Sequence, residues 1–219
     1  MPGLLTSRSA IAGTWRAWLE QPLSPEFFAR PTLAVARDLL GCRLVRSLDG
    51  IRLVGIITET EAYIGETDLG CHAKAGRTKR TAPMYGPPGR AYVYFTYGMH
   101  WMLNAVTEAE AFPAAVLIRA VETVEGLRVV ESRREKAPRA DWTNGPAKLT
   151  AAFGIDSRQN TIDLTQTNSG LWIEPGIAIS DTNVTTGPRV GLNSVPEPWK
   201  SIPWRFKVSG ILFQTSSDT

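Results

Sequence analysis

Cysteine, histidine and long apolar runs are all scarce in this chain. Its two cysteines, Cys42 and Cys71, do not form a C-x-x-C pair, and only two histidines occur among 219 residues. This argues against a disulfide scaffold and a zinc site built from cysteines, and it indicates a reducing compartment. No apolar run approaches the roughly 18–20 residues that span a bilayer. Residues 1–20 also lack the apolar core of a secretory signal peptide, so we expect a loosely ordered extension there.

Charge of either sign is moderate. Hydrophobic residues make up 43% and charged residues 21% of the chain, which is typical of a globular protein, and the length fits one substantial domain. A net charge of +3 and a pI near 9.0 make the chain mildly basic. This balance allows nucleic-acid binding without requiring it, because the placement of the charges matters more than their sum.

The first structured segment is predicted to be helical. Ser24 is a candidate N-cap and Pro25 suits the first helical position, while Pro31 divides the segment into two helices. The second helix is expected over 32–40, where Gly41 ends it.

The rest of the chain is mostly strand-like. Asp49-Gly50 predicts a hairpin turn, followed by a long strand from Ile51 to about Tyr63. Further strands are expected within 91–98, 100–107, 114–122, 170–180 and 204–213, and helices over about 125–136 and after residue 145. The sum predicts a single mixed α+β domain, residues 21–214, with a curved, mainly antiparallel sheet, flanking helices and a protruding hairpin. Residues 215–219 are expected to form a tail.

Two carboxylates end the long strand. Side chains alternate along a strand, so Glu59, Glu61 and Tyr63 share one face. They fit either a solvated strand end paired with arginines or a general base whose pKa is adjusted by burial and a nearby cation. Spacing alone does not choose between Glu59 and Glu61.

Asp68 and His72 follow in a glycine-rich loop. Together with Glu59 and Glu61 they could supply a metal site of oxygen and nitrogen ligands, although no stereotyped ligand spacing is present. A histidine that stacks or donates a hydrogen bond in a pocket explains His72 at least as well.

The same loop region is rich in cations. Lys74, Arg77, Lys79, Arg80 and Arg90 lie among glycines and prolines that leave backbone amides free. This pattern indicates a loop that contacts phosphate groups, with a solvated basic loop as the alternative.

The segment from Ala91 to Asn104 is unusually aromatic. On a strand Tyr92 and Tyr94 point to one face, while Val93 and Phe95 point to the other and are expected to join the core.

A turn follows this strand. Tyr97 stands beside Gly98 and is predicted at a hairpin tip, and Asn104 lies on the returning strand. Flat rings with one amide suit a purine or pyrimidine base, whereas a tyrosine-rich core strand is the alternative.

Four long motifs occur in order: ETEAYIG, CHAKAGRTKRTAPMYGPPGRAYVYFTYGMHWMLN, VLIRAVE and NGPAKLTAAFGI. They strongly resemble the alkyladenine (3-methyladenine) DNA glycosylase family, over nearly all of 26–213. The resemblance implies a monofunctional enzyme that flips an alkylated or deaminated purine from duplex DNA and hydrolyses its N-glycosidic bond. It implies no metal, no cofactor and no lyase step.

The resemblance also assigns roles. Glu61 would activate the attacking water, Arg119 would help to place it, and Tyr97 would wedge into the duplex. Tyr63, His72 and Tyr94 would surround the flipped base, and Asn104 would exclude guanine. Candidate phosphate contacts are Arg77, Lys79, Arg80, Arg90 and Lys148.

Other functions stay open at this point. A non-catalytic nucleic-acid-binding module would use the same rings and cations, and a metal-dependent nuclease would use the acids and His72. A lyase would need an amine nucleophile such as the terminal amine of Pro2. The expected partner is double-stranded DNA with a damaged purine, bound by a monomer without an obligate protein partner or membrane. A bacterial cytoplasm is the expected location, or the nucleus in a eukaryote.

Overall fold

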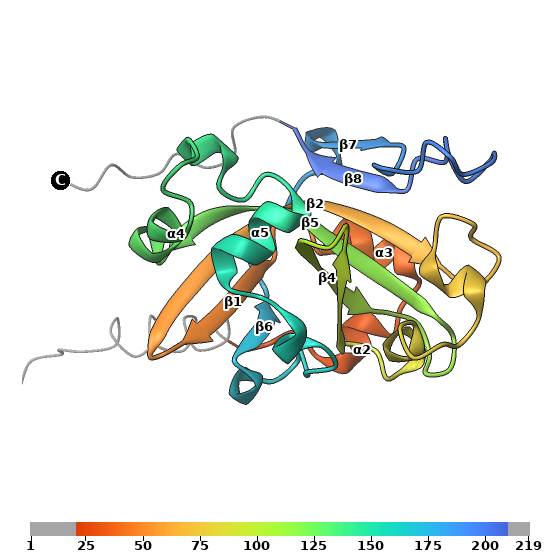
Figure 1. Ribbon diagram of the computed structural model, residues 1–219, viewed down its shortest axis with the longest axis horizontal. Coiled ribbons are helices and arrows are strands. Elements are labelled where there is room, and N and C mark those ends of the chain that lie inside the picture. The colour runs from red at the N-terminus through yellow and green to blue at the C-terminus, as the bar shows by residue number, and fades with distance from the viewer. Residues whose placement is uncertain (1–20, 210–219) are drawn as a thin grey trace, which may run out of the picture.

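The computed structural model describes residues 21–209 (Figure 1). The expected extension over 1–20 and the expected tail over 215–219 lie outside this range, as does the end of the last expected strand.

An eight-stranded sheet dominates the fold. Its strands run in the order β3-β4-β5-β2-β1-β6, with β8 joined to β2 and β7 joined to β8, and every described pairing of named strands is antiparallel. The strands are β1 (Arg43–Leu48), β2 (Ile51–Ile64), β3 (Ala91–Thr96), β4 (His100–Val106), β5 (Ala114–Glu125), β6 (Leu171–Glu174), β7 (Val184–Gly187) and β8 (Arg205–Val208). The predicted mixed α+β class with an antiparallel sheet is confirmed.

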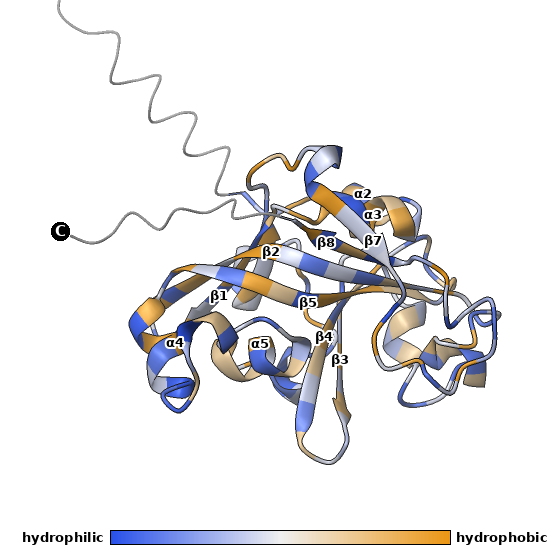
Figure 2. Ribbon diagram, turned by 90° about the horizontal axis from the view of Figure 1, so that it is seen from above, coloured by the Kyte–Doolittle hydropathy of each residue, from blue (hydrophilic) through white to orange (hydrophobic). Residues whose placement is uncertain are grey.

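Helices cover both faces of this sheet. They are α2 (Pro25–Phe28), α3 (Thr32–Asp38), α4 (Leu127–Arg133) and α5 (Pro146–Phe153). Figure 2 shows α2 and α3 on one side of the β2–β5 band and α4 and α5 on the other. Short 3₁₀ helices fill the connections: η1 (His72–Ala75), η2 (Ala82–Tyr85), η3 (Arg139–Asp141), η4 (Ser157–Gln159), η5 (Thr167–Ser169) and η6 (Asp181–Asn183). In the described part of the chain, no helix has the length and apolarity to cross a bilayer.

The predicted first hairpin is confirmed. Leu48 pairs with Ile51, and the two turn residues Asp49 and Gly50 have φ of 51° and 77°. Such a turn with two positive φ angles matches the twist of the flanking strands, and asparagine, aspartate and glycine tolerate it best. Ser24 and Pro25 begin α2 as expected, although the Ser24 side chain makes no capping hydrogen bond.

Strand β2 carries the two candidate carboxylates, Glu59 and Glu61. Its first half pairs with β1, whereas its second half pairs with β8, where Glu61 lies opposite Arg205. The pairing with β5 shifts register between Glu59 and Thr60, and Arg119 is the residue skipped there. A β-bulge of this kind turns a side chain out of the regular alternation. It brings Arg119 to the two carboxylates of β2.

The hairpin of β3 and β4 extends beyond the sheet (Figure 2). Only residues Asn104 to Val106 of β4 pair with β5, so the outer part is a two-stranded ribbon. The prediction that Phe95 joins the core is therefore wrong: its side chain is 43% exposed. Phe95 packs against Trp101 of β4 instead, with ring centres 4.7 Å apart. Val93 belongs to the core as predicted.

Other elements differ from the prediction at their ends. Helix α4 is shorter than the expected 125–136, because β5 continues to Glu125, which pairs with Val54. Strand β6 covers only the first part of the expected 170–180 segment, and β7 was not anticipated.

Candidate active site

One cavity of about 420 Å³ collects the residues predicted to act on a base. This volume lies in the range of small-molecule sites, roughly 300–1,000 Å³. The cavity opens between the β3–β4 hairpin, the end of β2, the 70–72 loop and the 190–192 segment. Its lining includes Tyr63, His72, Tyr94, Tyr97, Asn104 and Arg119.

Glu61 lies directly behind this lining, with its side chain 0% exposed. Its Oε1 accepts a hydrogen bond from the Val190 backbone N–H at 2.7 Å and lies 3.2 Å from Arg119 Nη1. Its Oε2 accepts a hydrogen bond from the Tyr63 hydroxyl at 2.8 Å. Tyr63, Arg119 and Val190 all line the cavity, so the carboxylate forms the layer immediately beneath its wall.

Burial and polar contacts act on the Glu61 carboxyl in opposite directions. Burial raises its pKa and is the largest cause, whereas Arg119, the Val190 N–H and the Tyr63 hydroxyl lower it. Because burial prevails, the pKa of Glu61 lies above its usual value of 4.5. Burial and the Glu61 charge raise the pKa of Tyr63 well above 10, so the phenol stays a proton donor to Glu61.

Glu59 differs from Glu61 in what it contacts. Its Oε1 accepts from Arg119 Nε at 2.8 Å and from Arg205 Nη1 at 3.3 Å, whereas Glu61 also binds the cavity-lining Tyr63 and Val190. The shared face predicted for the two acids is confirmed, because Arg119 bridges them. Glu59 anchors this arginine, while Glu61 stands behind the cavity.

Aromatic rings form one wall of the cavity. The His72 and Tyr94 ring centres lie 4.5 Å apart in an edge-to-face arrangement, and His72 Nδ1 lies 3.0 Å from the Tyr92 hydroxyl. Burial, together with the charges of Arg80 and Lys74, lowers the pKa of His72 to about 4. The imidazole is therefore neutral at physiological pH.

Asn104 lies opposite Tyr92 in the hairpin, and its Nδ2 donates to the Tyr92 carbonyl at 3.0 Å. This bond fixes the amide, which is nearly buried at the cavity wall.

Tyr97 occupies the hairpin tip, as predicted. Its φ of 53° and the φ of 68° at Gly98 form the turn, and its side chain is 80% exposed. A large ring held in water on a projecting ribbon has no packing role in this fold.

The weak metal site considered from the sequence does not form. Asp68 pairs with Arg189, the other two acids pair with Arg119, and His72 contacts Tyr92. Within residues 21–209 there is no group of three or more histidine, cysteine or acidic side chains that could hold a metal ion. The four side chains that the nuclease alternative would use therefore contact other residues of the chain.

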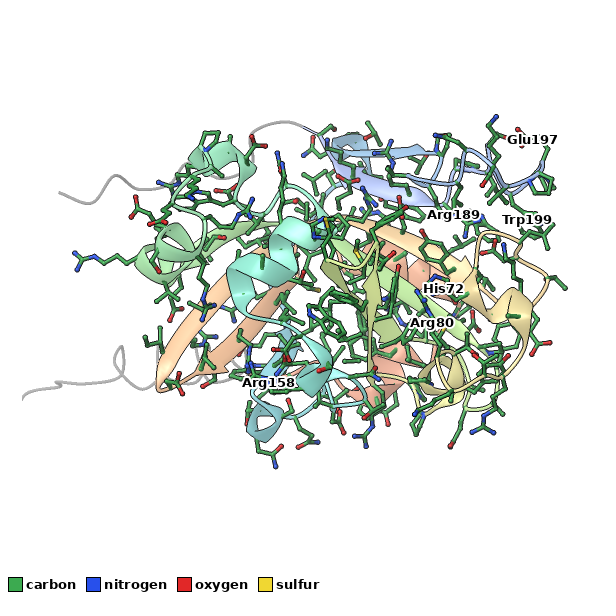
Figure 3. The ribbon with its side chains drawn as sticks, in the orientation of Figure 1. His72, Arg80, Arg158, Arg189, Glu197 and Trp199 are labelled. Carbon is green, nitrogen blue, oxygen red and sulfur yellow. The ribbon has the colours of Figure 1, made fainter. Side chains whose placement is uncertain are left out.

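The candidate phosphate contacts are dispersed. Arg80 lies over the Tyr94 ring, 5.2 Å from its centre, and Figure 3 shows it near His72. Arg77 lies over Tyr85 at 5.8 Å.

Three more of these cations lie elsewhere. Lys79 and Arg90 border a separate open hollow of about 540 Å³, and Arg90 also pairs with Asp163 at 3.4 Å. Lys148 is bound to Asp141 at 2.9 Å, one residue beyond the cavity-lining Pro146-Ala147.

Sequence reasoning missed several residues of the site. Tyr92 lines the cavity beside Tyr94, and the alternation that placed both rings on one face was the available signal. The Val190 N–H has no such signal, because every residue except proline carries one. Cys71 also lines the cavity, but burial raises the pKa of its thiol to about 12, so it is a packing residue rather than a nucleophile.

Comparison with known proteins places the chain among relatives of like length. Three relatives are each provisionally named a 3-methyladenine DNA glycosylase. The relative from Carboxydothermus hydrogenoformans is 45% identical, and the match covers 84% of this chain and 93% of the relative. The relatives from Methanocella arvoryzae and Myxococcus xanthus are both 46% identical; their matches cover 84% and 85% of this chain and 92% and 89% of the relatives, respectively. The sequence profile of the methylpurine-DNA glycosylase family matches residues 26–211, which include every residue of the cavity described above. The chain belongs to the methylpurine-DNA glycosylase family.

Proposed function

We propose that this DNA glycosylase takes an alkylated or deaminated purine out of duplex DNA into the 420 Å³ cavity and hydrolyses its bond to the sugar. The observation that carries the proposal is the position of Glu61, whose carboxylate contacts three cavity-lining residues from behind.

In the proposed reaction Glu61 acts as the general base. A water molecule replaces one hydrogen-bonding partner of the carboxylate, gives its proton to Glu61, and its oxygen attacks the anomeric carbon of the sugar. The bond from that carbon to the base nitrogen breaks, and its electron pair leaves with the base. A purine that alkylation has made cationic departs as a neutral base. A neutral purine such as hypoxanthine departs as its anion and then takes a proton from solvent water.

The surroundings of Glu61 support this role. Arg119 and the Val190 N–H hold the carboxylate in one orientation, and a carboxylate close to the reaction centre also stabilises the positive charge that develops on the sugar. The raised pKa makes it a stronger base than an exposed glutamate.

The walls of the cavity suit the base itself. Tyr63 stands on β2, while His72 and Tyr94 form the aromatic wall, so a flat base can stack on rings. A cationic base gains roughly 0.5–2 kcal/mol over such a ring. The fixed amide of Asn104 is proposed to clash with the exocyclic amine of normal guanine. Flipping costs a few kcal/mol and costs least for weakly paired lesions, which adds to selectivity.

We expect the purified protein to release hypoxanthine or an alkylated adenine from a duplex oligonucleotide with one such base. The products should be the free base and an abasic strand that stays intact until alkali is added. Chromatography of the released base and gel analysis with and without alkali measure the two products. Undamaged duplex is the control. Binding without base release would support the non-catalytic alternative, and activity abolished by EDTA would contradict the proposed mechanism.

Tyr97 is proposed to fill the gap that the flipped base leaves. Stacking of a base on an aromatic ring contributes about 1–3 kcal/mol, so Tyr97→Ala should lower excision from duplex DNA by roughly 5–150-fold. The same variant should excise the base from a single strand at nearly the wild-type rate, because a single strand has no gap to fill. Met99→Ala removes another exposed side chain of the same tip and should have the smaller effect on the duplex. Equal losses on both substrates would contradict a wedge role.

The proposed partner is duplex DNA alone, bound by a monomer. Lys148 follows the cavity-lining Pro146 and Ala147 in α5, whereas Lys79 and Arg90 border the separate hollow. These cations are proposed to contact phosphates on either side of the flipped nucleotide.

A further inference from the structure

A buried ion pair lies next to the cavity. Asp68 and Arg189 both have fully buried side chains, and they meet through two parallel contacts. Arg189 Nη2 donates to Asp68 Oδ1 at 2.8 Å and Nη1 donates to Asp68 Oδ2. Figure 3 shows Arg189 with Trp199 on the neighbouring loop. No step of the reaction described above uses either residue.

Arg189 is joined to Glu61 through the backbone. Its Nη1 also donates to the carbonyl of Ala62, at 3.0 Å, which lies in β2 between Glu61 and Tyr63. The next residue, Val190, donates its N–H to Glu61 Oε1. The guanidinium therefore fixes the distance between the 189–190 backbone and the strand that carries Glu61.

Arg189 also holds the Tyr63 ring. Its guanidinium carbon lies 4.7 Å from the centre of the Tyr63 ring and 5.1 Å from that of Trp204. A planar guanidinium stacks on aromatic faces in a way that an ammonium does not. The Tyr63 ring is thus fixed beside the cavity, and its hydroxyl donates to Glu61 Oε2.

Asp68 joins Arg189 to the 70–72 loop through hydrogen bonds. Its carboxylate accepts from the N–H groups of Ile64 at 3.2 Å and of Gly70 at 2.9 Å. A Cβ atom at Gly70 would stand 2.7 Å from Arg189 Nη2, so only glycine allows this approach. His72 follows two residues later. The ion pair therefore connects three segments around the cavity: the end of β2, the 70–72 loop and the 189–190 backbone.

We propose that Asp68 and Arg189 are positioning residues, which hold the Val190 N–H and the Tyr63 hydroxyl against Glu61 and so fix the general base in its reactive orientation. This inference rests on the role proposed for Glu61. The alternative is that the pair only stabilises the fold. The two can be separated, because neutral side chains often replace a buried ion pair without loss of stability, whereas removing one partner leaves an unpaired charge.

The test uses two variants of the full chain. Arg189→Lys keeps the charge but loses the planar fork and the stacking, and Asp68→Asn with Arg189→Gln gives a neutral amide pair. Single-turnover excision is measured across pH, at temperatures where thermal melts show each variant folded. We expect at least a tenfold lower maximal rate for either variant. We also expect the acid limb of the profile to move to higher pH.

The direction of that movement follows from the groups around Glu61. The Val190 N–H, the Tyr63 hydroxyl and the Arg119 charge favour its ionised form, while Glu59 opposes it. Arg205 pairs with Glu59, so it acts on Glu61 only through that neighbour. The variants loosen the contacts of Val190 and Tyr63 and leave Arg119, Glu59 and Arg205 in place. Loss of two groups that favour the carboxylate raises its pKa.

Glu174→Gln is the matched control. Glu174 is a buried carboxylate of β6, paired with Arg52 at 2.8 Å and Arg43 at 3.2 Å and remote from the cavity lining. This variant should lower the melting temperature and leave the maximal rate and the acid limb unchanged. If a folded Arg189→Lys or amide-pair variant matches wild type in both readouts, the pair is only a structural brace. An inactive wild type, or an active Glu61→Gln, would instead contradict the proposed function itself.

Discussion

Glu61→Gln is expected to lower the single-turnover rate of base excision by about 10²–10⁴-fold, the usual contribution of a general base. Glutamine has nearly the same shape and can still accept the Val190 N–H, so the cavity should persist. What is lost is the ability to take the proton of the attacking water. The measurement is excision from a duplex with one hypoxanthine or alkylated adenine, at saturating enzyme.

Glu59→Gln is the control for this experiment. It makes the same change two residues away on the same face of β2, to a carboxylate that pairs with Arg119 and Arg205, whereas the Val190 N–H and the Tyr63 hydroxyl bind Glu61. Its effect should be much smaller than that of Glu61→Gln. Similar losses in both variants would show that the role belongs to the carboxylate pair and not to Glu61. Wild-type excision by Glu61→Gln would end the proposed mechanism.

The acid limb of the wild-type pH profile should also report Glu61. A general base must be ionised, so activity falls as the pH drops through the pKa of its carboxyl group. Burial raises that pKa above 4.5, so the limb should lie above the range of an exposed glutamate. His72 should not contribute a limb near neutrality, because its pKa is lowered to about 4.

Arg119→Leu is expected to have the second largest effect, on both stability and activity. Arg119 contacts Glu59 at 2.8 Å and Glu61 at 3.2 Å, and all three side chains are largely buried. Removing the arginine leaves two neighbouring carboxylates, of which Glu59 keeps its contact with Arg205. Breaking a buried pair in this way typically costs about 3–5 kcal/mol of stability. Urea unfolding at neutral pH measures that loss.

The same variant should shift the acid limb. The charge of Arg119 is the largest influence that lowers the pKa of Glu61, so its removal raises that pKa and moves the limb to higher pH. Adding Glu59→Gln to Arg119→Leu removes one of the two neighbouring negative charges and should recover part of the stability. Unchanged unfolding and an unchanged pH profile in Arg119→Leu would contradict the bridging role.

Much of the site could be predicted because its side chains follow regular strand alternation. Glu59, Glu61 and Tyr63 share one face of β2, and the bridging contacts of Arg119 and the Tyr63 hydroxyl confirm it. The turn at Tyr97-Gly98 was equally readable, since two residues with positive φ favour a tight hairpin. The local sequence pattern is sufficient to predict a side chain's position where the local backbone alone decides its direction.

The sequence pattern did not predict contacts that depend on segments far apart in the chain. Asp68 and Arg189 are 121 residues apart in sequence, and nothing in either segment specifies the other. Phe95 has the same alternation as Val93, but whether a face is covered depends on how far β5 extends alongside β4. The Val190 N–H contacts Glu61 only because β8 and the segment before it fold against β2.

The projecting β3–β4 ribbon has a mechanical consequence. Tyr94 lies on β3 and Tyr97 lies three residues later in the turn, so at most roughly 10 Å of chain separates them. The Phe95–Trp101 contact stiffens the ribbon between them. If Tyr97 has the wedge role proposed above, the hairpin would set a fixed distance: the depth to which its tip enters the DNA would determine where the displaced nucleotide meets His72 and Tyr94. A two-residue insertion in the tip would leave Tyr63, His72 and Tyr94 on their own elements and would lengthen the distance from them to the tip.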